Sequence, residues 1–264
     1  MTGQVTSADG TVIAYDRAGT GPAVVLVHGA FTDRAHPILR TVADALAPWF
    51  TVCNYDRRGR GGSGDTAPYA VEREIEDLAA VIAAAGGSAM VFGGSSGAAL
   101  ALTAAARLPA ITKLALWEPP YHVDEGAPSL PGDFAERLET LVAGDRRGDA
   151  VELFLVEAAE VPPQVVAAMR AEPTWAQAEA VAHTLAYEAA VLGPANALPT
   201  ALLATVTQPT LVMAGDRSPG WLAAACRAVA DGVPHARHRV LAGQTHAVAA
   251  EVLAPELLEF FVTA

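Results

Sequence analysis

The chain has 264 residues, of which 52% are hydrophobic and 17% charged, a composition typical of a globular protein with a substantial buried core. Its formal net charge of −12 argues against nucleic acid or an anionic membrane surface as a partner. Residues 1–7 contain neither a basic nor an apolar segment, so no secretory signal is predicted and we expect a cytoplasmic protein.

The first half of the chain is predicted to alternate between strands and helices. Short, largely apolar segments predict strands at 12–15, 23–27, 50–55, 89–92 and 113–117. Between them, helices are predicted around 35–46, 71–85 and 98–107. Such alternation predicts a mostly parallel sheet with right-handed crossovers. The stretch 78–106 carries no charge, but glycine-rich turns divide it and argue against a membrane span.

The pattern changes after residue 120. Residues 121–207 contain no convincing buried strand and are predicted to form helices separated by Pro and Gly. The strand–helix pattern then resumes, with strands at 209–214 and 238–241 and helices near 222–230 and from about 247. We therefore predict a core domain of residues 1–120 and 208–264. The helical cap, residues 121–207, should lie over the carboxyl ends of the strands.

Ser95 is the candidate nucleophile. It lies in Gly93-Gly94-Ser95-Ser96-Gly97, between a predicted buried strand and a helix-forming run. A G-x-S-x-G pattern in that context is typical of a nucleophile elbow, a strained turn that lifts the serine hydroxyl above the sheet. A plain Gly/Ser turn is the alternative, and the motifs elsewhere in the chain disfavour it.

A serine nucleophile needs an adjacent base, because the hydroxyl is weakly nucleophilic at its ordinary pKa. His246 follows the last predicted strand, in a loop at the same sheet edge as Ser95, and is the predicted base. His28 also ends a strand, but it adjoins the predicted oxyanion loop. There the backbone N–H groups of Ala30 and Ser96 are expected to hold a developing oxyanion.

Four segments together resemble motifs of the α/β-hydrolase superfamily, over essentially the whole chain. They are His28-Gly29-Ala30-Phe31, Asp56-Arg57-Arg58-Gly59-Arg60-Gly61-Gly62-Ser63, the elbow, and Gly243-Gln244-Thr245-His246. The resemblance implies an α/β fold with an eight-stranded, mostly parallel sheet and a helical cap inserted after the sixth strand. It also implies a triad in the order serine, acid, histidine, and it says little about the substrate.

The triad acid departs from the common family pattern. Where family members carry Asp after the seventh strand, this chain has Ser218. Glu118 ends the sixth predicted strand, a position where similar enzymes such as haloalkane dehalogenases carry a triad Glu. Asp216 is the alternative acid, although Arg217 beside it could be its partner instead. We predict Glu118.

No cofactor or metal is expected. Residues 59–64 satisfy G-x-G-x-x-G, but the next helix is predicted to begin only near residue 71, whereas a dinucleotide site needs the last glycine to open a helix. No cluster of metal-ligating residues stands out in the sequence either.

The expected activity is that of a carboxylesterase-like serine hydrolase, which cleaves an ester, thioester or lactone bond through an acyl-enzyme. Its partner would be a small to medium, largely apolar acyl substrate, and a homodimer is one possible assembly. The predicted pocket walls are Phe31, Trp117, Met169 and Trp175. The same triad serves carbon–carbon bond hydrolysis or a cofactor-free biosynthetic reaction. The alternative hypothesis outside the enzymes is a protein that binds a ligand and does not catalyse a reaction.

Overall fold

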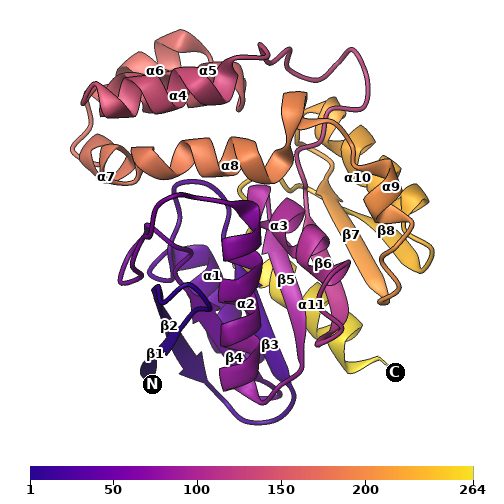
Figure 1. Cartoon of the computed structure of the whole chain (residues 1–264). Coiled ribbons are helices and arrows are strands. Elements are labelled where there is room, and N and C mark those ends of the chain that lie inside the picture. The colour runs from indigo at the N-terminus through magenta and orange to yellow at the C-terminus, as the bar shows by residue number, and fades with distance from the viewer. Residues whose placement is uncertain (264) are drawn as a thin grey trace.

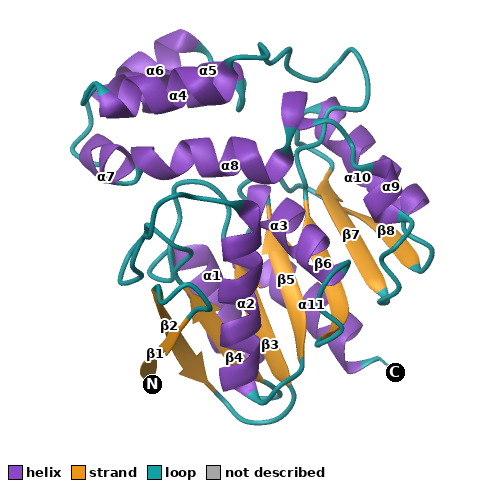
Figure 2. Cartoon of the chain, in the orientation of Figure 1, coloured by secondary structure: helices purple, strands orange, loops and turns teal. Residues whose placement is uncertain are grey.

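An eight-stranded sheet forms the centre of the computed structural model, which describes residues 1–263 (Figure 2). The strands are β1 (Thr2–Thr6), β2 (Val12–Ala18), β3 (Ala23–Val27), β4 (Thr51–Tyr55), β5 (Ala89–Gly94), β6 (Ile111–Trp117), β7 (Thr210–Gly215) and β8 (Ala236–Leu241). Their order across the sheet is β1-β2-β4-β3-β5-β6-β7-β8. β1 pairs with β2, and β2 with β4, in antiparallel fashion, whereas the six strands β3 to β8 are parallel to one another.

Helices cover both faces of this sheet (Figure 1). One face packs against α1 (Pro37–Leu46) and α11 (Ala250–Val262). The other packs against α2 (Val71–Ala85), α3 (Ser96–Ala105) and α10 (Gly220–Gly232). This arrangement explains why β3 is apolar throughout, since every residue of this strand is buried between two helical layers. Strand β4 is buried to the same degree but also carries the polar residues Thr51 and Asn54.

A helical insert between β6 and β7 lies above the carboxyl ends of the parallel strands (Figure 1). It contains α4 (Phe134–Ala143), α5 (Arg147–Glu157), α6 (Pro163–Arg170), α7 (Trp175–Ala180), α8 (Leu185–Leu192), α9 (Thr200–Leu203) and the short 3-10 helices η1 (Ala182–Thr184) and η2 (Pro194–Asn196). Most of these helices share an apolar cluster of their own. Helix α8 also packs on α3 of the core, and α9 on α10. The predicted boundaries at residues 120 and 208 stay a prediction.

The fold differs from the predicted elements mainly at the edges of the sheet. Strand β1 was not expected, because it is an edge strand whose residues alternate between exposed and half-buried, with Val5 as its one large apolar residue. Strand β8 begins at Ala236 and α11 at Ala250, two and three residues from the predicted positions. Within residues 1–263, none of the helices is both long enough and apolar enough to cross a bilayer.

Candidate active site

Ser95 occupies a strained turn between β5 and α3. Its backbone angles are φ 56° and ψ −129°, a region that non-glycine residues rarely adopt. The turn is held because Ser95 N–H donates to the carbonyl of Trp117 at 2.8 Å. Glycine is required on both sides, since a Cβ on Gly93 or on Gly97 would overlap neighbouring backbone. Ser95 therefore has the geometry of a nucleophile elbow.

His246 and Glu118 lie next to each other at the same edge of the sheet. His246 Nδ1 is 2.7 Å from Glu118 Oε2, and the other carboxylate oxygen accepts the Gly215 N–H at 2.7 Å. Glu118 is fully buried, whereas the His246 side chain is 44% exposed. Both oxygens of this buried carboxylate are therefore hydrogen-bonded, as an ionised group in that position requires.

Ser95 and His246 line the same cavities. Because Glu118 engages Nδ1, Nε2 is the ring nitrogen of His246 that has no contact with this carboxylate. Both side chains belong to the wall of two adjoining spaces beneath the insert. The structure thus brings Ser95, His246 and Glu118 to one place from three separate loops.

Asp216, the alternative acid, has a different partner. Its Oδ1 accepts the backbone N–H of Gly243 at 2.7 Å, on the exposed side of the loop that carries His246. Asp216 therefore braces the turn before His246, while Glu118 contacts the imidazole itself. Ser218, which stands at the usual acid position, has a buried hydroxyl with no hydrogen-bond partner among the described residues.

Ala30 and Ser96, the predicted oxyanion donors, both line the smaller of the two cavities together with Ser95. Ser96 is the first residue of α3, so its N–H belongs to the set that an α-helix leaves without an internal partner. Gly29 passes directly against the nucleophile: a Cβ on Gly29 would lie 2.9 Å from Ser95 Cβ and 3.6 Å from Ser95 Oγ. The peptide that joins Gly29 to Ala30 therefore lies beside the serine hydroxyl.

The two cavities differ in size and position. The smaller has a volume of about 130 Å³ and lies between the insert and α10, with Phe134, Ala189, Leu192 and Leu222 in its wall. The larger has a volume of about 370 Å³ and lies beneath the loop after β3, with Ile38, Phe92 and Val248 in its wall. Phe154 and Ala159 belong to both walls. Both spaces are lined mainly by apolar side chains.

Two of the four predicted pocket walls lie elsewhere. Phe31 and Trp117 line the larger cavity, and Trp117 Nε1 also donates to the carbonyl of His246 at 2.9 Å. Met169 is 40% exposed on α6, and Trp175 is buried in the apolar cluster of the insert with its Nε1 on Glu179. The expectation for Met169 and Trp175 is corrected, because their helix faces point to solvent and to the insert interior.

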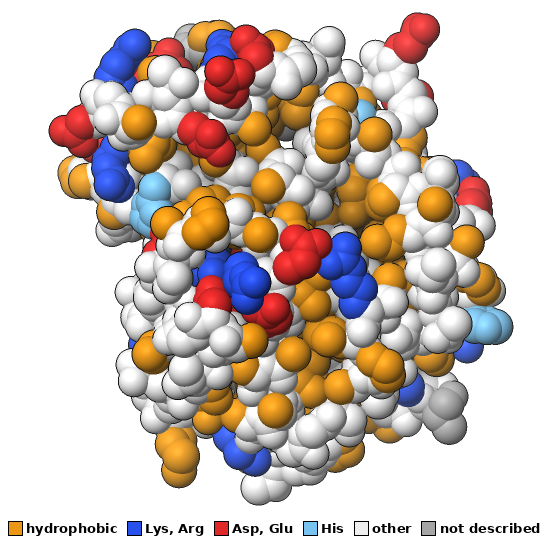
Figure 3. Space-filling view, viewed as in Figure 1, with side chains coloured by type: hydrophobic (Ala, Val, Ile, Leu, Met, Phe, Trp, Pro, Cys, Tyr) orange, Lys and Arg blue, Asp and Glu red, His pale blue; other side chains and the backbone are white. Residues whose placement is uncertain are grey.

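The acidic character of the insert is largely a surface property. Residues 121–200 contain 13 Asp and Glu against 4 Arg. Several of these carboxylates pair with the arginines, as in Arg137–Glu157 and Arg170–Glu152. In Figure 3, acidic and basic side chains lie together on the insert at the top of the view. Partly exposed pairs of this kind contribute about 0–1 kcal/mol each.

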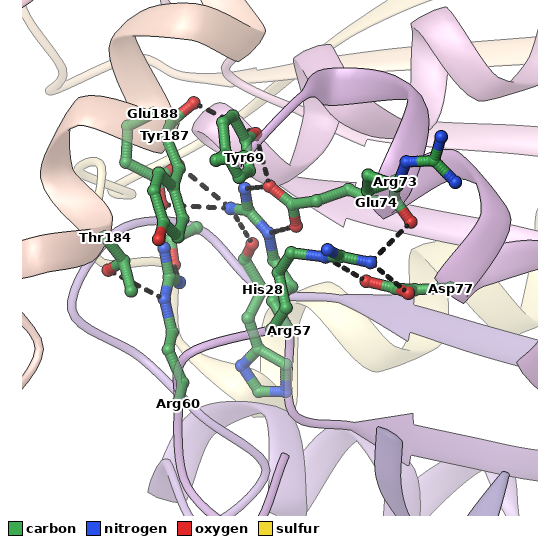
Figure 4. A network of polar contacts seen from close by, with 12 residues as sticks. His28, Arg57, Arg60, Tyr69, Arg73, Glu74, Asp77, Thr184, Tyr187 and Glu188 are labelled. Atoms are coloured by element: carbon green, nitrogen blue, oxygen red, sulfur yellow. Dashed lines mark hydrogen bonds and ion pairs between the residues drawn. The ribbon is translucent and has the colours of Figure 1, made fainter. Parts of the chain in front are cut away.

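Sequence reasoning missed a buried ionic network beside the site (Figure 4). Arg57 donates to both oxygens of Glu74 at 2.6 Å and to Glu188 of α8 at 2.9 Å. Arg60 also pairs with Glu188, and all four side chains are buried. The available signal was a run of arginines directly after a buried strand, because a buried guanidinium must have an anionic partner.

His28 is not a second base. It is fully buried and its Nε2 lies 2.5 Å from Asn54 Oδ1. Burial lowers the pKa of His28 to about 3. The imidazole is therefore neutral near pH 7, and it takes no part in the cavity walls described above.

Comparison with known proteins agrees with this architecture. The chain is 56% identical to an alpha/beta hydrolase from Sphaerobacter thermophilus DSM 20745, with a TM-score of 0.92 over 98% of this chain and 100% of that one. It also resembles a thermophilic esterase from Thermogutta terrifontis, solved with malate bound, at 24% identity and a TM-score of 0.74 over 99% and 98% of the two chains. That second likeness supports the fold alone.

A shorter match connects the chain to an uncharacterized hydrolase, YraK, of Bacillus subtilis (strain 168). The two are 38% identical over 104 residues, a segment that spans 38% of each protein. A model described as "Alpha/beta hydrolase family" matches residues 24–254, and the predicted fold is confirmed by the observed sheet and insert. The chain belongs to the alpha/beta hydrolase family.

Proposed function

We propose that this protein is a serine hydrolase that cleaves an ester, thioester or lactone bond of a small to medium, largely apolar substrate. The observation that carries the proposal is the hydrogen bond between buried Glu118 and His246, beside a serine in elbow geometry. A carboxylate, an imidazole and a strained serine at one cavity are the components of nucleophilic acyl transfer.

In the proposed mechanism Ser95 Oγ attacks the acyl carbon while His246 Nε2 accepts the hydroxyl proton. The resulting oxyanion receives hydrogen bonds from the N–H groups of Ala30 and Ser96. His246 then donates its proton to the leaving group, and an acyl-enzyme forms on Ser95. Water, deprotonated by His246, releases the acid. Glu118 orients the imidazole throughout and stabilises its charged form.

The two cavities could each hold one of the two parts of the substrate that the cleaved bond joins. We assign the acyl group to the smaller cavity, whose wall includes both proposed oxyanion donors, and the leaving group to the larger one. Their apolar linings favour hydrocarbon groups, since burial of apolar surface contributes roughly 25 cal/mol per Å².

Hydrolysis of aryl esters with acyl chains of about two to eight carbons tests the proposal. The wild-type protein should show saturable hydrolysis, and Ser95→Ala should lose at least about 10³-fold in kcat, because the nucleophile is removed. Ester hydrolysis that survives in Ser95→Ala would contradict the assignment of the nucleophile. Carbon–carbon bond cleavage of a β-diketone, in which the leaving group is an enolate that takes up a proton, with no ester turnover would contradict the proposed acyl substrate.

A further inference from the structure

The peptide group between Gly29 and Ala30 is held by hydrogen bonds to its carbonyl oxygen. The Gly29 carbonyl oxygen accepts hydrogen bonds from Arg60 Nη1 at 2.5 Å and from Thr32 Oγ1 at 3.0 Å. The preceding carbonyl, of His28, accepts a hydrogen bond from Arg57 Nη1 at 3.2 Å. Both carbonyls at the end of β3 are thus fixed by the arginine-rich loop that follows β4.

Fixing the carbonyl of a peptide also fixes its N–H. In a planar trans peptide, the C=O of one residue and the N–H of the next point in opposite directions. Because the Gly29 carbonyl points to Arg60, the Ala30 N–H points away from Arg60. Gly29 lies against Ser95, and Ala30 lines the cavity that holds the serine hydroxyl. Arg60, together with Thr32, therefore fixes the direction of this proposed oxyanion donor.

Arg60 is in turn held by the insert. Its Nη2 forms an ion pair with Glu188 of α8, and its Nε donates to Thr184 Oγ1 at 3.2 Å (Figure 4). Arg57 shares the same carboxylate at 2.9 Å. Arg60 is 2% exposed, and it is not among the residues that line either cavity at Ser95. The guanidinium thus connects helix α8 to the loop after β3 without lining either cavity.

We propose that Arg60 is a positioning residue that directs the Ala30 N–H toward the oxyanion. Because Arg60 is itself held by Glu188 of α8 and by Thr184, the direction of this donor depends on the position of α8. The inference rests on the proposed function, because an oxyanion arises only when Ser95 attacks a carbonyl. A preorganised donor contributes most where it cannot rotate to another acceptor, and removal of one such donor typically costs 10²–10³-fold in kcat.

Arg58 provides the matched control. It lies in the same loop, its side chain is fully buried, and it pairs with Asp77 at 2.8 Å and with Asp9 at 3.0 Å. Its hydrogen bonds go to Asp9, Arg73 and Asp77, which lie neither at the end of β3 nor in α8. If Arg60 served only the stability of the fold, Arg58→Gln and Arg60→Gln would change catalysis at Ser95 to the same extent.

The test uses an aryl trifluoromethyl ketone, whose carbonyl is attacked by serine to give a hemiketal. The pKa of that hemiketal hydroxyl, followed by ¹³C NMR of the full-length protein, reports oxyanion stabilisation directly. We expect Arg60→Gln to raise the hemiketal pKa by at least about one pH unit and to lower kcat by about tenfold or more, with KM changed by less than about threefold. Arg60→Lys should restore part of both effects, since it keeps the charge but not the planar donor geometry.

Two further variants keep the inference testable if Arg60→Gln fails to fold. Thr184→Val and Glu188→Gln leave Arg60 in place and weaken its attachment to the insert, so both should raise the hemiketal pKa in the same direction by a smaller amount. Glu188→Gln also weakens the contact of Arg57 with the insert, so Thr184→Val is the more selective of the two variants. A hemiketal pKa equal to that of the wild type in Thr184→Val, Glu188→Gln and any folded Arg60 variant would overturn the inference. So would an equal rise in Arg58→Gln. If the wild-type protein forms no hemiketal at Ser95, the proposed function fails first and this inference with it.

Discussion

Glu118 Oε2 and His246 Nδ1 lie 2.7 Å apart although the two residues are 128 positions apart in the chain. Glu118 follows β6, His246 follows β8, and Gly215 at the end of β7 donates to the second carboxylate oxygen. Three neighbouring strands therefore end around one carboxylate. The convergence follows from the parallel sheet, because parallel strands present their carboxyl ends at a common edge.

Glu118→Gln and Asp216→Asn should separate the two candidate acids. Loss of the Glu118 charge removes the partner of the imidazolium and should lower kcat by about 10²–10⁴-fold. Asp216→Asn removes only a brace on an exposed turn and should lower kcat by less than about fivefold. Steady-state kinetics on one aryl ester check both values. A larger kcat loss in Asp216→Asn than in Glu118→Gln would contradict the role proposed for Glu118.

The sequence alone left the acid open for a physical reason. Glu118 and Asp216 both follow buried strands, and the local pattern does not show which carboxylate reaches a histidine on a third loop. That choice depends on the lateral order of β6, β7 and β8 and on backbone geometry at Glu118, which has φ 43°. The elbow, by contrast, is encoded locally within five residues.

Trp117→Phe should impair catalysis through the backbone of His246. The indole N–H donates to the His246 carbonyl at 2.9 Å, and phenylalanine removes that donor while keeping an aromatic wall. We expect kcat to fall roughly tenfold, which corresponds to a rise of about 1.4 kcal/mol in the activation free energy. Ile38→Ala, which alters the wall of the same cavity without removing a hydrogen bond to His246, should change mainly KM. Equal kcat values for Trp117→Phe and the wild type would show that this bond does not position the base.

Ala189→Phe should restrict the acyl group. Ala189 lies on α8 in the wall of the smaller cavity, whereas Ala190 is exposed and lines neither cavity. Phenylalanine at 189 fills part of a space of about 130 Å³, so kcat/KM for long acyl chains should fall at least tenfold more than that for acetate. Ala190→Phe is the control and should leave the chain-length profile unchanged. A loss confined to bulky alcohol groups would reverse the proposed assignment of the two cavities.

His28 should make the protein less stable in acid. Burial lowers the pKa of His28 to about 3, from an ordinary value of 6.5. Between these two pH values the unfolded imidazole binds a proton and the folded one does not, so acidification favours unfolding by up to about 1.4 kcal/mol per pH unit. Urea unfolding at about pH 7.5 and pH 5 should show a smaller decrease in His28→Gln than in the wild type. Parallel decreases would exclude His28 as the cause.

The central strands and helices could be predicted because each carries its own signal. β3 and the first four residues of β5 are short continuous apolar runs, and α2 repeats apolar residues with helical spacing. β1 lacks such a signal: its pairing with β2 stabilises five residues of mixed polarity at the edge of the sheet. Edge strands depend on a partner strand more than on their own composition.

The pocket walls and the partners of the buried arginines could not be predicted fully from the sequence, because they depend on contacts between residues that are distant in the chain. Trp175 and Met169 lie on helices whose orientation is set by the packing of the whole insert, so residue type did not show which of them would face the cavities. Arg57 reaches Glu188 across 131 residues and Glu74 across 17. A loop of arginines indicates that partners are needed, but the fold determines which carboxylates supply them.

Labelling with a fluorophosphonate tests the central claim most directly, because the probe phosphonylates a serine that a neighbouring base has activated. Intact-mass and peptide analysis should show one adduct per chain, on Ser95, with labelling abolished in Ser95→Ala and slowed at least about 100-fold in His246→Ala. An unlabelled wild-type protein, or an adduct that persists in Ser95→Ala, would contradict the account.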